Sequence, residues 1–283
     1  MTSHFLDPAA TVTLRSPDGA RASILLHGAQ LVSWQPAAGR GMPGAEQLYL
    51  SERARVAPGA AVRGGVPVIF PQFEQRGPLP RHGFARTAPW TLVSETTGAD
   101  HATAVLRLLA DAATRQIWPH DFVAELTVSI AAARVDVELS VENTGSEAFE
   151  FTCALHTYLR LEDARMATVE GLEGVRYLDS LAGGEERSQT HGQLHPLPQI
   201  DRIYLDVPTG LALREPGRRV SVEQDGFEDA VVWNPGAEGA RALADLPPEG
   251  HLHFCCLEAA QIMRPVHLAP GGQWQGRQAL IAS

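Results

Sequence analysis

The chain has 283 residues, a formal net charge of -10 and an apolar fraction of 44%. The acidic balance argues against nucleic acid or an anionic membrane as a general partner, because both favour basic surfaces. A small anionic ligand stays possible, because it responds to local charge. All 23 residues of the Lys+Arg total are arginine, which excludes Schiff-base chemistry and a P-loop, since both need lysine.

Short alternating runs between turn residues occur along most of the chain and predict β-strands. In chain order, the runs cover residues 11–36 (three strands), 101–111, 122–145 (a hairpin-like pair), 149–161, 202–207, 211–216, 218–226, 229–235, 251–259 and 264–274. Helical periodicity is scarce, and short helical turns are expected only near 47–55 and 239–245.

Many short strands with frequent Gly and Pro turns indicate an all-β sandwich or barrel. We expect one large antiparallel β-sandwich domain over residues 1–283, because no linker-like segment divides the chain. The segment 171–199 is the nearest candidate for a divider, and it is more typical of a long excursion over a site than of a hinge.

The cysteine pattern and the lack of targeting or membrane-spanning signals predict a cytoplasmic location. Cys153, Cys255 and Cys256 form no framework of paired spacings, so reduced, buried thiols are expected. The first residues have no charged region followed by an apolar one, and no run of about 18 apolar residues could span a bilayer.

A local reversal of charge marks the segment 63–90. It contains Arg63, Arg76, Arg81 and Arg86 but a single acid, Glu74. Arginine forks bind phosphate or carboxylate through two parallel hydrogen bonds. The segment therefore predicts an anion site. The alternative interpretation is a loop with scattered surface arginines, because arginine replaces lysine throughout this chain.

The strand at 149–161 carries a histidine in its middle. Alternation puts Thr152, Ala154, His156, Tyr158 and Arg160 on one face, opposite a mostly apolar face. A hydrogen-bonded, inert core histidine is one interpretation of His156. Its polar neighbours on the same face favour a position in a cleft.

The predicted strand at 251–262 has an apolar face, and a carboxylate stands at the end of that face. Leu252, Phe254, Cys256 and Glu258 alternate onto one face, and a buried carboxylate there would have its pKa raised, as general bases often do. A glutamate that simply reaches solvent at the strand end is the alternative.

Metal binding has little support in the same segment. His251, His253 and Cys255 would share a face, but three ligands on one strand need a fourth from elsewhere, and the spacing is not that of a zinc knuckle. We therefore predict no metal ligand.

In the segment "QIDRIYLDV", residues 199–207, two aspartates, Asp201 and Asp206, bracket an expected strand. Asp201 precedes the alternating residues, at a rim position suited to sugar hydroxyls or to a strand-entry cap. The patterns GxSxG and GxGxxG are missing from the chain, which leaves a serine hydrolase or a dinucleotide enzyme without local support.

Six motifs together resemble a known family. "RGGVPVIFPQF", "LPRHGFAR", "LHTYLR", "DRIY", "VVWNP" and "CLEAAQI…PVHLAPGGQW" occur in the order found in the hexose-6-phosphate mutarotases, or glucose-6-phosphate 1-epimerases, of the galactose-mutarotase-like superfamily. The resemblance implies a large β-sandwich with a sugar site in a concave cleft. Gln72 and Arg81 stand where the family usually has other residues.

The resemblance also implies roles for individual residues. His156 and Glu258 correspond to the family's catalytic pair. The substrate-binding set implied for the sugar and its phosphate comprises Arg63, Arg81, His82, Arg86 and Asp201.

Interconversion of α and β anomers needs a base for the anomeric hydroxyl and an acid for the ring oxygen, and no cofactor. We expect Glu258 as the base and protonated His156 as the acid, with the roles reversed on ring closure. The expected substrate is a hexose 6-phosphate, handled by a cytoplasmic monomer without nucleic acid or membrane partners. An aldose 1-epimerase for unphosphorylated sugars, a non-catalytic carbohydrate-binding protein and a lyase or isomerase of uronic acids remain alternatives.

Overall fold

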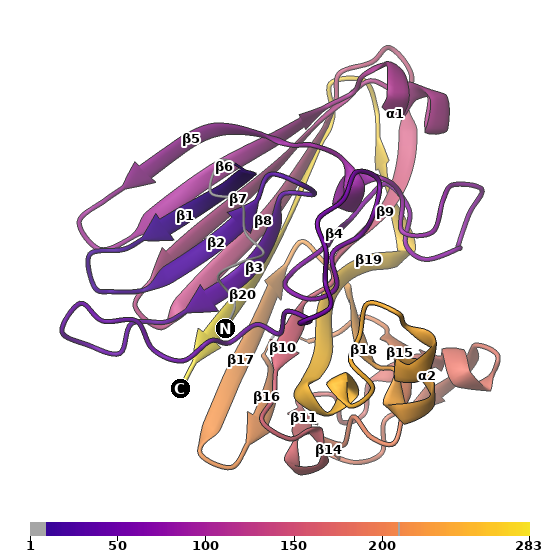
Figure 1. Ribbon diagram of the computed structural model, residues 1–283. Coiled ribbons are helices and arrows are strands. Elements are labelled where there is room, and N and C mark those ends of the chain that lie inside the picture. Colours follow the sequence, from indigo (N-terminus) through magenta and orange to yellow (C-terminus); the bar gives the residue numbers. More distant parts are fainter. Residues whose placement is uncertain (1–9, 209) are drawn as a thin grey trace.

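The computed structural model describes residues 10–208 and 210–283. Its strands form three antiparallel sheets (Figure 1). The smallest has the order β1-β2-β3 and consists of β1 (Thr11–Arg15), β2 (Arg21–Leu25) and β3 (Gln30–Gln35). In Figure 1 this small sheet lies over strands β6 to β8. The three sheets confirm the all-β prediction.

The largest sheet has nine strands within the described residues. In spatial order they are β14 (Gln193–Leu194), β11 (Thr168–Glu170), β16 (Leu211–Glu215), β17 (Arg218–Asp225), β20 (Gln273–Ala282), β8 (Arg134–Asn143), β7 (Phe122–Ala131), β6 (Ala102–Leu109) and β5 (Thr91–Thr97).

The third sheet has eight strands in the described part of the chain. Their order is β13 (Glu185–Ser188), β12 (Arg176–Asp179), β15 (Ile200–Tyr204), β18 (Asp229–Asn234), β19 (Phe254–Leu268), β9 (Phe149–Leu155) and β4 (Val68–Ile69), and β10 (Tyr158–Arg160) also pairs with β19. Because alternate residues of a strand point to opposite faces, this sheet separates the core from a second, outer face.

The core lies between this sheet and the other two. Leu155, Val232 and Leu257 from the eight-stranded sheet join one buried cluster with Leu126 of β7 and Trp34 of β3. On the other side of the same strands, residues such as Ala154, Val231 and Ile203 form a separate small cluster. One face of the sheet is therefore committed to the sandwich core, and the other is available for a site.

Helices are short and connect strands. The described residues contain α1 (Ala112–Ile117) and α2 (Gly236–Ala242), with 3-10 turns η2 (Ala85–Thr87), η3 (Ala164–Met166), η4 (Ser180–Ala182) and η5 (Gly250–His253). The sequence reading missed α1, which begins with a capping box between Asp111 and Thr114. The turn expected near 239–245 corresponds to α2, which begins earlier.

The structure has no helix at 47–55, where a helical turn was expected. A hydrogen-bonded turn runs from the Ala54 N–H to the Ser51 carbonyl at 3.0 Å, and the residues before it make isolated bridges, Leu48 with Leu159 and Leu50 with Gly64. The backbone N–H of Tyr49 donates to the carbonyl of Tyr158 at 3.0 Å. Pairing with distant strands outweighs the weak local preference for a helix.

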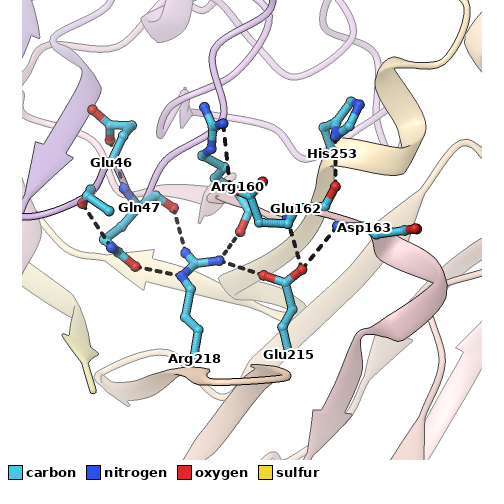
Figure 2. Close-up of polar contacts among 9 residues, drawn as sticks. Glu46, Gln47, Arg160, Glu162, Asp163, Glu215, Arg218 and His253 are labelled. Atoms are coloured by element: carbon cyan, nitrogen blue, oxygen red, sulfur yellow. Dashed lines mark hydrogen bonds and ion pairs between the residues drawn. The ribbon is translucent and has the colours of Figure 1, made fainter.

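A polar network ties the end of β10 to the β16–β17 hairpin (Figure 2). Arg218 donates from Nη1 to Glu215 Oε2 at 3.0 Å and from Nε to Gln47 Oε1 at 2.9 Å. Glu215 Oε1 accepts from the backbone N–H groups of Glu162 and Asp163 at 2.9 and 3.1 Å. The network joins the two large sheets where the chain leaves the strand that follows His156.

Candidate active site

A cleft of about 530 Å³ opens on the outer face of the eight-stranded sheet. Its lining combines a few apolar side chains with many ionisable ones, and it includes all seven residues predicted for the site: Arg63, Arg81, His82, Arg86, His156, Asp201 and Glu258. Ser180, Gly183 and Gly184 also line it. The segment 171–199 therefore reaches the site, as expected, but it carries strands β12 to β14 and is not a bare loop.

Strand register brings His156 and Glu258 together. Leu155 of β9 lies opposite Ala259, and Tyr158 of β10 lies opposite Cys256. The same antiparallel register, continued through the break between β9 and β10, puts His156 opposite Glu258. His156 Nδ1 lies 3.3 Å from Glu258 Oε1, and the two side chains are 11% and 1% exposed.

The pair is close but not satisfied by hydrogen bonds. Among the described residues, His156 Nδ1 and Glu258 Oε2 are buried without a hydrogen-bond partner. Burial raises the pKa of Glu258 well above its usual value, and the nearby Asp201 carboxylate adds to this, against the opposing effect of Arg86. Burial, His82 and the two arginines Arg86 and Arg63 lower the pKa of His156 well below its usual value.

Arg63 is fixed by two partners that the sequence reading did not identify. It donates from Nη1 to the Tyr158 hydroxyl at 3.0 Å and from Nε to Asp245 Oδ2 at 3.2 Å. Tyr158 and Asp245 raise the pKa of Arg63 further above its already high value. The arginine therefore stays charged and held in place at the cleft wall.

The two glycines after Arg63 let its segment lie against neighbouring backbone. Gly64 and Gly65 have φ values of +116° and +61°, in the region that favours glycine. A Cβ would come within 2.3 Å of the Tyr49 carbonyl oxygen at Gly64 and 2.2 Å of the Leu31 carbonyl oxygen at Gly65. This explains the motif "RGG" in physical terms.

Arg86 is a cation without an acidic partner. Within residues 10–208 and 210–283 it forms no ion pair, and its Nε is buried without a hydrogen bond, while Nη2 donates to the Arg81 carbonyl at 3.1 Å. Burial and the charges of Arg63 and Arg81 lower its pKa to about 10, so it stays charged at neutral pH. Such a group is suited to binding an anion.

Arg81 is less committed to the cleft. Its side chain is 62% exposed and pairs with Glu74 at 2.9 Å. Gln72, which the family resemblance marks as unusual, holds the same segment: its amide N–H groups donate to the carbonyls of Glu74 and Leu79, and its Oε1 accepts from the Leu79 N–H. Gln72 therefore shapes the segment that carries Arg81.

His82 is buried in the cleft as a neutral ring. Burial and the charges of Arg86, Arg81 and Arg63 lower its pKa to about 3. Its Nδ1 accepts from the Glu74 N–H at 3.3 Å, which leaves the ring proton on Nε2 as a donor. Asp201 stands on β15, and burial raises its pKa despite the Ser180 hydroxyl beside it.

Tyr158, which the sequence left unexplained, packs against His156 in the structure. Its ring stacks on His156 at a centroid distance of 4.9 Å and an angle of 10°. Trp233 meets the same histidine edge to face at 5.9 Å. Alternation along the strand places Tyr158 on the same face as His156. Its hydrogen bond to Arg63 depends on the tertiary structure.

Other residues that the sequence analysis singled out lie outside the cleft. Asp206 pairs with Arg176 and Arg264 at the exposed end of β15. Arg160 pairs with Glu162 at 3.7 Å on the surface. The shared strand face suggested for His251, His253 and Cys255 is wrong, because both histidines lie in the 3-10 turn η5.

The comparison with known families decides the class of this protein. The family model for aldose 1-epimerase matches residues 10–280. The chain belongs to the aldose 1-epimerase family. It is an epimerase that acts on carbohydrates, and the resemblance inferred from the motifs is confirmed.

Relatives of this epimerase agree in sequence and in fold. The chain is 34% identical over 282 residues to a protein of Cenchrus ciliaris named "Putative glucose-6-phosphate 1-epimerase", covering 96% of this chain and 84% of the relative. An Escherichia coli K12 protein of the same name is 35% identical over 263 residues, covering 88% and 85%.

Solved structures show the same architecture. A crystal structure from Salmonella typhimurium, described as a "putative mutarotase", superimposes with a TM-score of 0.87 at 28% identity, covering 96% of this chain and 90% of the other. A Synechocystis protein superimposes with a TM-score of 0.80 at 22% identity, covering 100% and 99%. In the described part of the epimerase, no helix is long and apolar enough to cross a membrane.

Proposed function

We propose that this epimerase interconverts the α and β anomers of hexose 6-phosphates. The observation that carries the proposal is a buried histidine–carboxylate pair, 3.3 Å apart, in a cleft that also contains unpaired arginine charge. The pair is suited to move protons at the anomeric centre, and the arginines are suited to hold a phosphate. The names of the Cenchrus and Escherichia coli relatives support the same substrate class.

In the proposed reaction, Glu258 removes the proton of the anomeric hydroxyl while His156 protonates the ring oxygen. The ring opens to the aldehyde, the C1–C2 bond rotates, and the ring closes from the other face with the two roles reversed. Two facing groups of different proton affinity can do this without a cofactor. Tyr158 and Trp233 contact the His156 ring and would hold its orientation.

The charge of the substrate matters for this assignment. In the free cleft, burial raises the pKa of Glu258 and lowers the pKa of His156, so burial by itself opposes the charged pair that the reaction needs. A phosphate dianion on Arg63 and Arg86 would cancel the positive charge that disfavours protonated His156. The same cancellation would remove the effect of Arg86 that lowers the pKa of Glu258, so phosphate binding would raise the proton affinity of both groups.

The substrate-binding roles follow the charges in the cleft. We assign the phosphate to Arg86 and Arg63, with Arg81 at the rim. Asp201 and the Nε2–H of His82 would bind sugar hydroxyls, since a carboxylate accepts and this ring donates. Remote binding of the phosphate would position C1 between His156 and Glu258. We also expect a single-domain, cytoplasmic monomer.

Two-dimensional exchange NMR with a panel of sugars tests the proposal. Cross-peaks between the α and β anomers of glucose 6-phosphate should grow with enzyme concentration much faster than those of free glucose. Equal acceleration of both sugars would favour an epimerase for unphosphorylated sugars. Sugar binding without any acceleration would favour a non-catalytic carbohydrate-binding protein.

A further inference from the structure

A buried thiol stands beside the histidine–carboxylate pair. Cys256 and Glu258 alternate onto the same face of β19, and Tyr158, next but one to His156, lies opposite Cys256. One ligand atom from each of His156, Cys256 and Glu258 lies within 4.8 Å of the others, and all three residues are buried. The mechanism proposed above uses the histidine and the glutamate but has no role for the thiol.

Two of these three residues present polar atoms that no protein group satisfies. His156 Nδ1 and Glu258 Oε2 are buried without a hydrogen-bond partner within the part of the chain that the structure describes. Cys256 is a free cysteine, so its sulfur is not used in a disulfide. Buried polar atoms normally have partners, so this cluster is open to a ligand that bonds to nitrogen, sulfur and oxygen at once.

We propose that His156, Cys256 and Glu258 form a binding site for a borderline-soft divalent cation such as Zn²⁺, which inhibits the enzyme by occupying its histidine–carboxylate pair. The metal site rests on geometry alone. Only the inhibition depends on the function proposed above, because it requires that the pair move protons in the reaction.

The donor set selects the class of metal. An imidazole, a thiolate and a carboxylate are the ligand types of zinc sites, which in open sites combine three protein ligands with a fourth position left for water or another ligand. Here the fourth position would face the cleft. Mg²⁺ and Ca²⁺ prefer oxygen ligands only, so they should bind poorly to this set.

The distances need only a small adjustment. Zinc bonds of roughly 2.0 to 2.3 Å in a tetrahedron place ligand atoms about 3.3 to 3.8 Å apart. The His156–Glu258 separation is already 3.3 Å, and every separation in the cluster is within 4.8 Å. Side-chain rotations that close about 1 Å would complete the geometry.

The nearby positive charge does not prevent binding. The metal bonds to the thiolate sulfur of Cys256, the carboxylate oxygen of Glu258 and a ring nitrogen of His156, and the thiol and carboxyl protons leave to solvent. One divalent cation replaces two protons, so the net charge of the cleft is unchanged. Arg63 and Arg86 would oppose an added cation far more than this exchange.

Cobalt titration of the whole protein tests the site without reference to catalysis. Co²⁺ bound to a thiolate gives a sulfur-to-metal charge-transfer band in the near ultraviolet. The band should appear with wild type, be displaced by Zn²⁺ but not by Mg²⁺, and disappear in Cys256→Ser. Cys255→Ser is the matched control, because this adjacent buried thiol points into the sandwich core, and it should keep the band.

Each outcome of the cobalt experiment decides the site. A band that persists in folded Cys256→Ser, or no band with wild type, would overturn it. If Cys256→Ser fails to fold, Cys256→Ala and the His156→Ala variant take its place, and both should lose tight Co²⁺ binding while their circular dichroism matches wild type.

Turnover in zinc-buffered solution tests the inhibition. Zn²⁺ should inhibit wild type and Cys255→Ser, and a chelator should restore them fully. Cys256→Ser should need at least about tenfold more free zinc for the same inhibition, since it lacks one ligand. Cobalt binding without zinc inhibition would overturn the inhibitory role but keep the site. Metal-free wild type that does not accelerate anomer exchange would instead contradict the proposed function.

Discussion

Two buried glutamates of this epimerase have opposite surroundings. Glu215, with a side chain 5% exposed, pairs with Arg218 and accepts two backbone N–H groups in the network of Figure 2. Glu258, with a side chain 1% exposed, has an oxygen without a hydrogen-bond partner in the described residues and a second carboxylate, Asp201, nearby.

The contrast separates a structural charge from a reactive one. The carboxylate of Glu215 has hydrogen-bond partners on both oxygens and holds two sheets together. The unsatisfied carboxylate of Glu258 is costly for folding but ready to exchange a proton. Perturbed, unpaired groups of this kind are typical of functional sites, so the two glutamates should respond differently to the same substitution.

The largest expected effect is on turnover. His156→Ala and Glu258→Gln should each lower anomer exchange at least about a hundredfold, the lower end for loss of acid–base catalysis. Polarimetry or exchange NMR measures the rate. Glu215→Gln is the matched control and should keep most of its turnover wherever it is folded, because Glu215 is outside the cleft. Near-normal exchange in either His156→Ala or Glu258→Gln would contradict the proposed roles.

The next effect concerns Arg86, an unpaired cation that lines the cleft. Arg86→Ala should raise KM for a hexose 6-phosphate by roughly 10- to 100-fold, as expected for losing charged hydrogen bonds of about 1.5 to 3 kcal/mol. The rate with free glucose should change little. Arg160→Ala, an exposed arginine away from the cleft, should leave both unchanged. Equal effects of Arg86→Ala on both sugars would mean that Arg86 does not bind the phosphate.

The free energy of unfolding should depend on Glu215 more than on Glu258, which is the reverse of the order expected for turnover. Glu215→Gln should lower the free energy of unfolding by about 1 to 3 kcal/mol, because Arg218 loses its charged partner in a buried network. Glu258→Gln should leave this free energy unchanged or raise it, since it removes an uncompensated buried acid. Urea unfolding measures both. A clear loss of stability in Glu258→Gln would show that this carboxyl group is satisfied in solution.

A smaller, pH-dependent effect sharpens the same comparison. Folded Glu258 keeps its proton above the usual value of 4.5, where the unfolded chain has released it. The folded state then binds more protons than the unfolded state, so this group's contribution to the free energy of unfolding falls as pH rises.

The advantage of Glu258→Gln over wild type should therefore grow with pH, by at most about 1.4 kcal/mol per pH unit. Urea unfolding of both proteins at mildly acidic and mildly alkaline pH gives the difference, in which contributions of unrelated groups cancel. An advantage that shrinks with increasing pH would show that the pKa of Glu258 is not raised in the folded protein.

Local patterns were enough to predict much of the site. Alternation within single strands placed His156 on the more polar face of its strand and Glu258 at the end of an apolar face, and the arginines of 63–90 were visible as a local excess of charge. The structure puts these residues in one cleft. Alternation is a property of consecutive residues, so it can be interpreted without knowing which strands are neighbours.

The partners of these residues could not be predicted in the same way. The contacts of Tyr158 and Asp245 with Arg63, and the cluster of Cys256 with His156 and Glu258, join segments far apart in the chain. The absence of a helix at 47–55 has a related cause, because the backbone of residues 48–50 pairs with distant segments.

By itself, the sequence determined the all-β class, the family motifs and the faces of the strands, since these depend on composition and on the period of two. Only the tertiary structure decided that β9, β10 and β19 pair in the register that sets His156 against Glu258, and that Glu215 is satisfied while Glu258 is not. Register and burial depend on the packing of whole sheets, and a shift of one residue would turn each side chain to the other face.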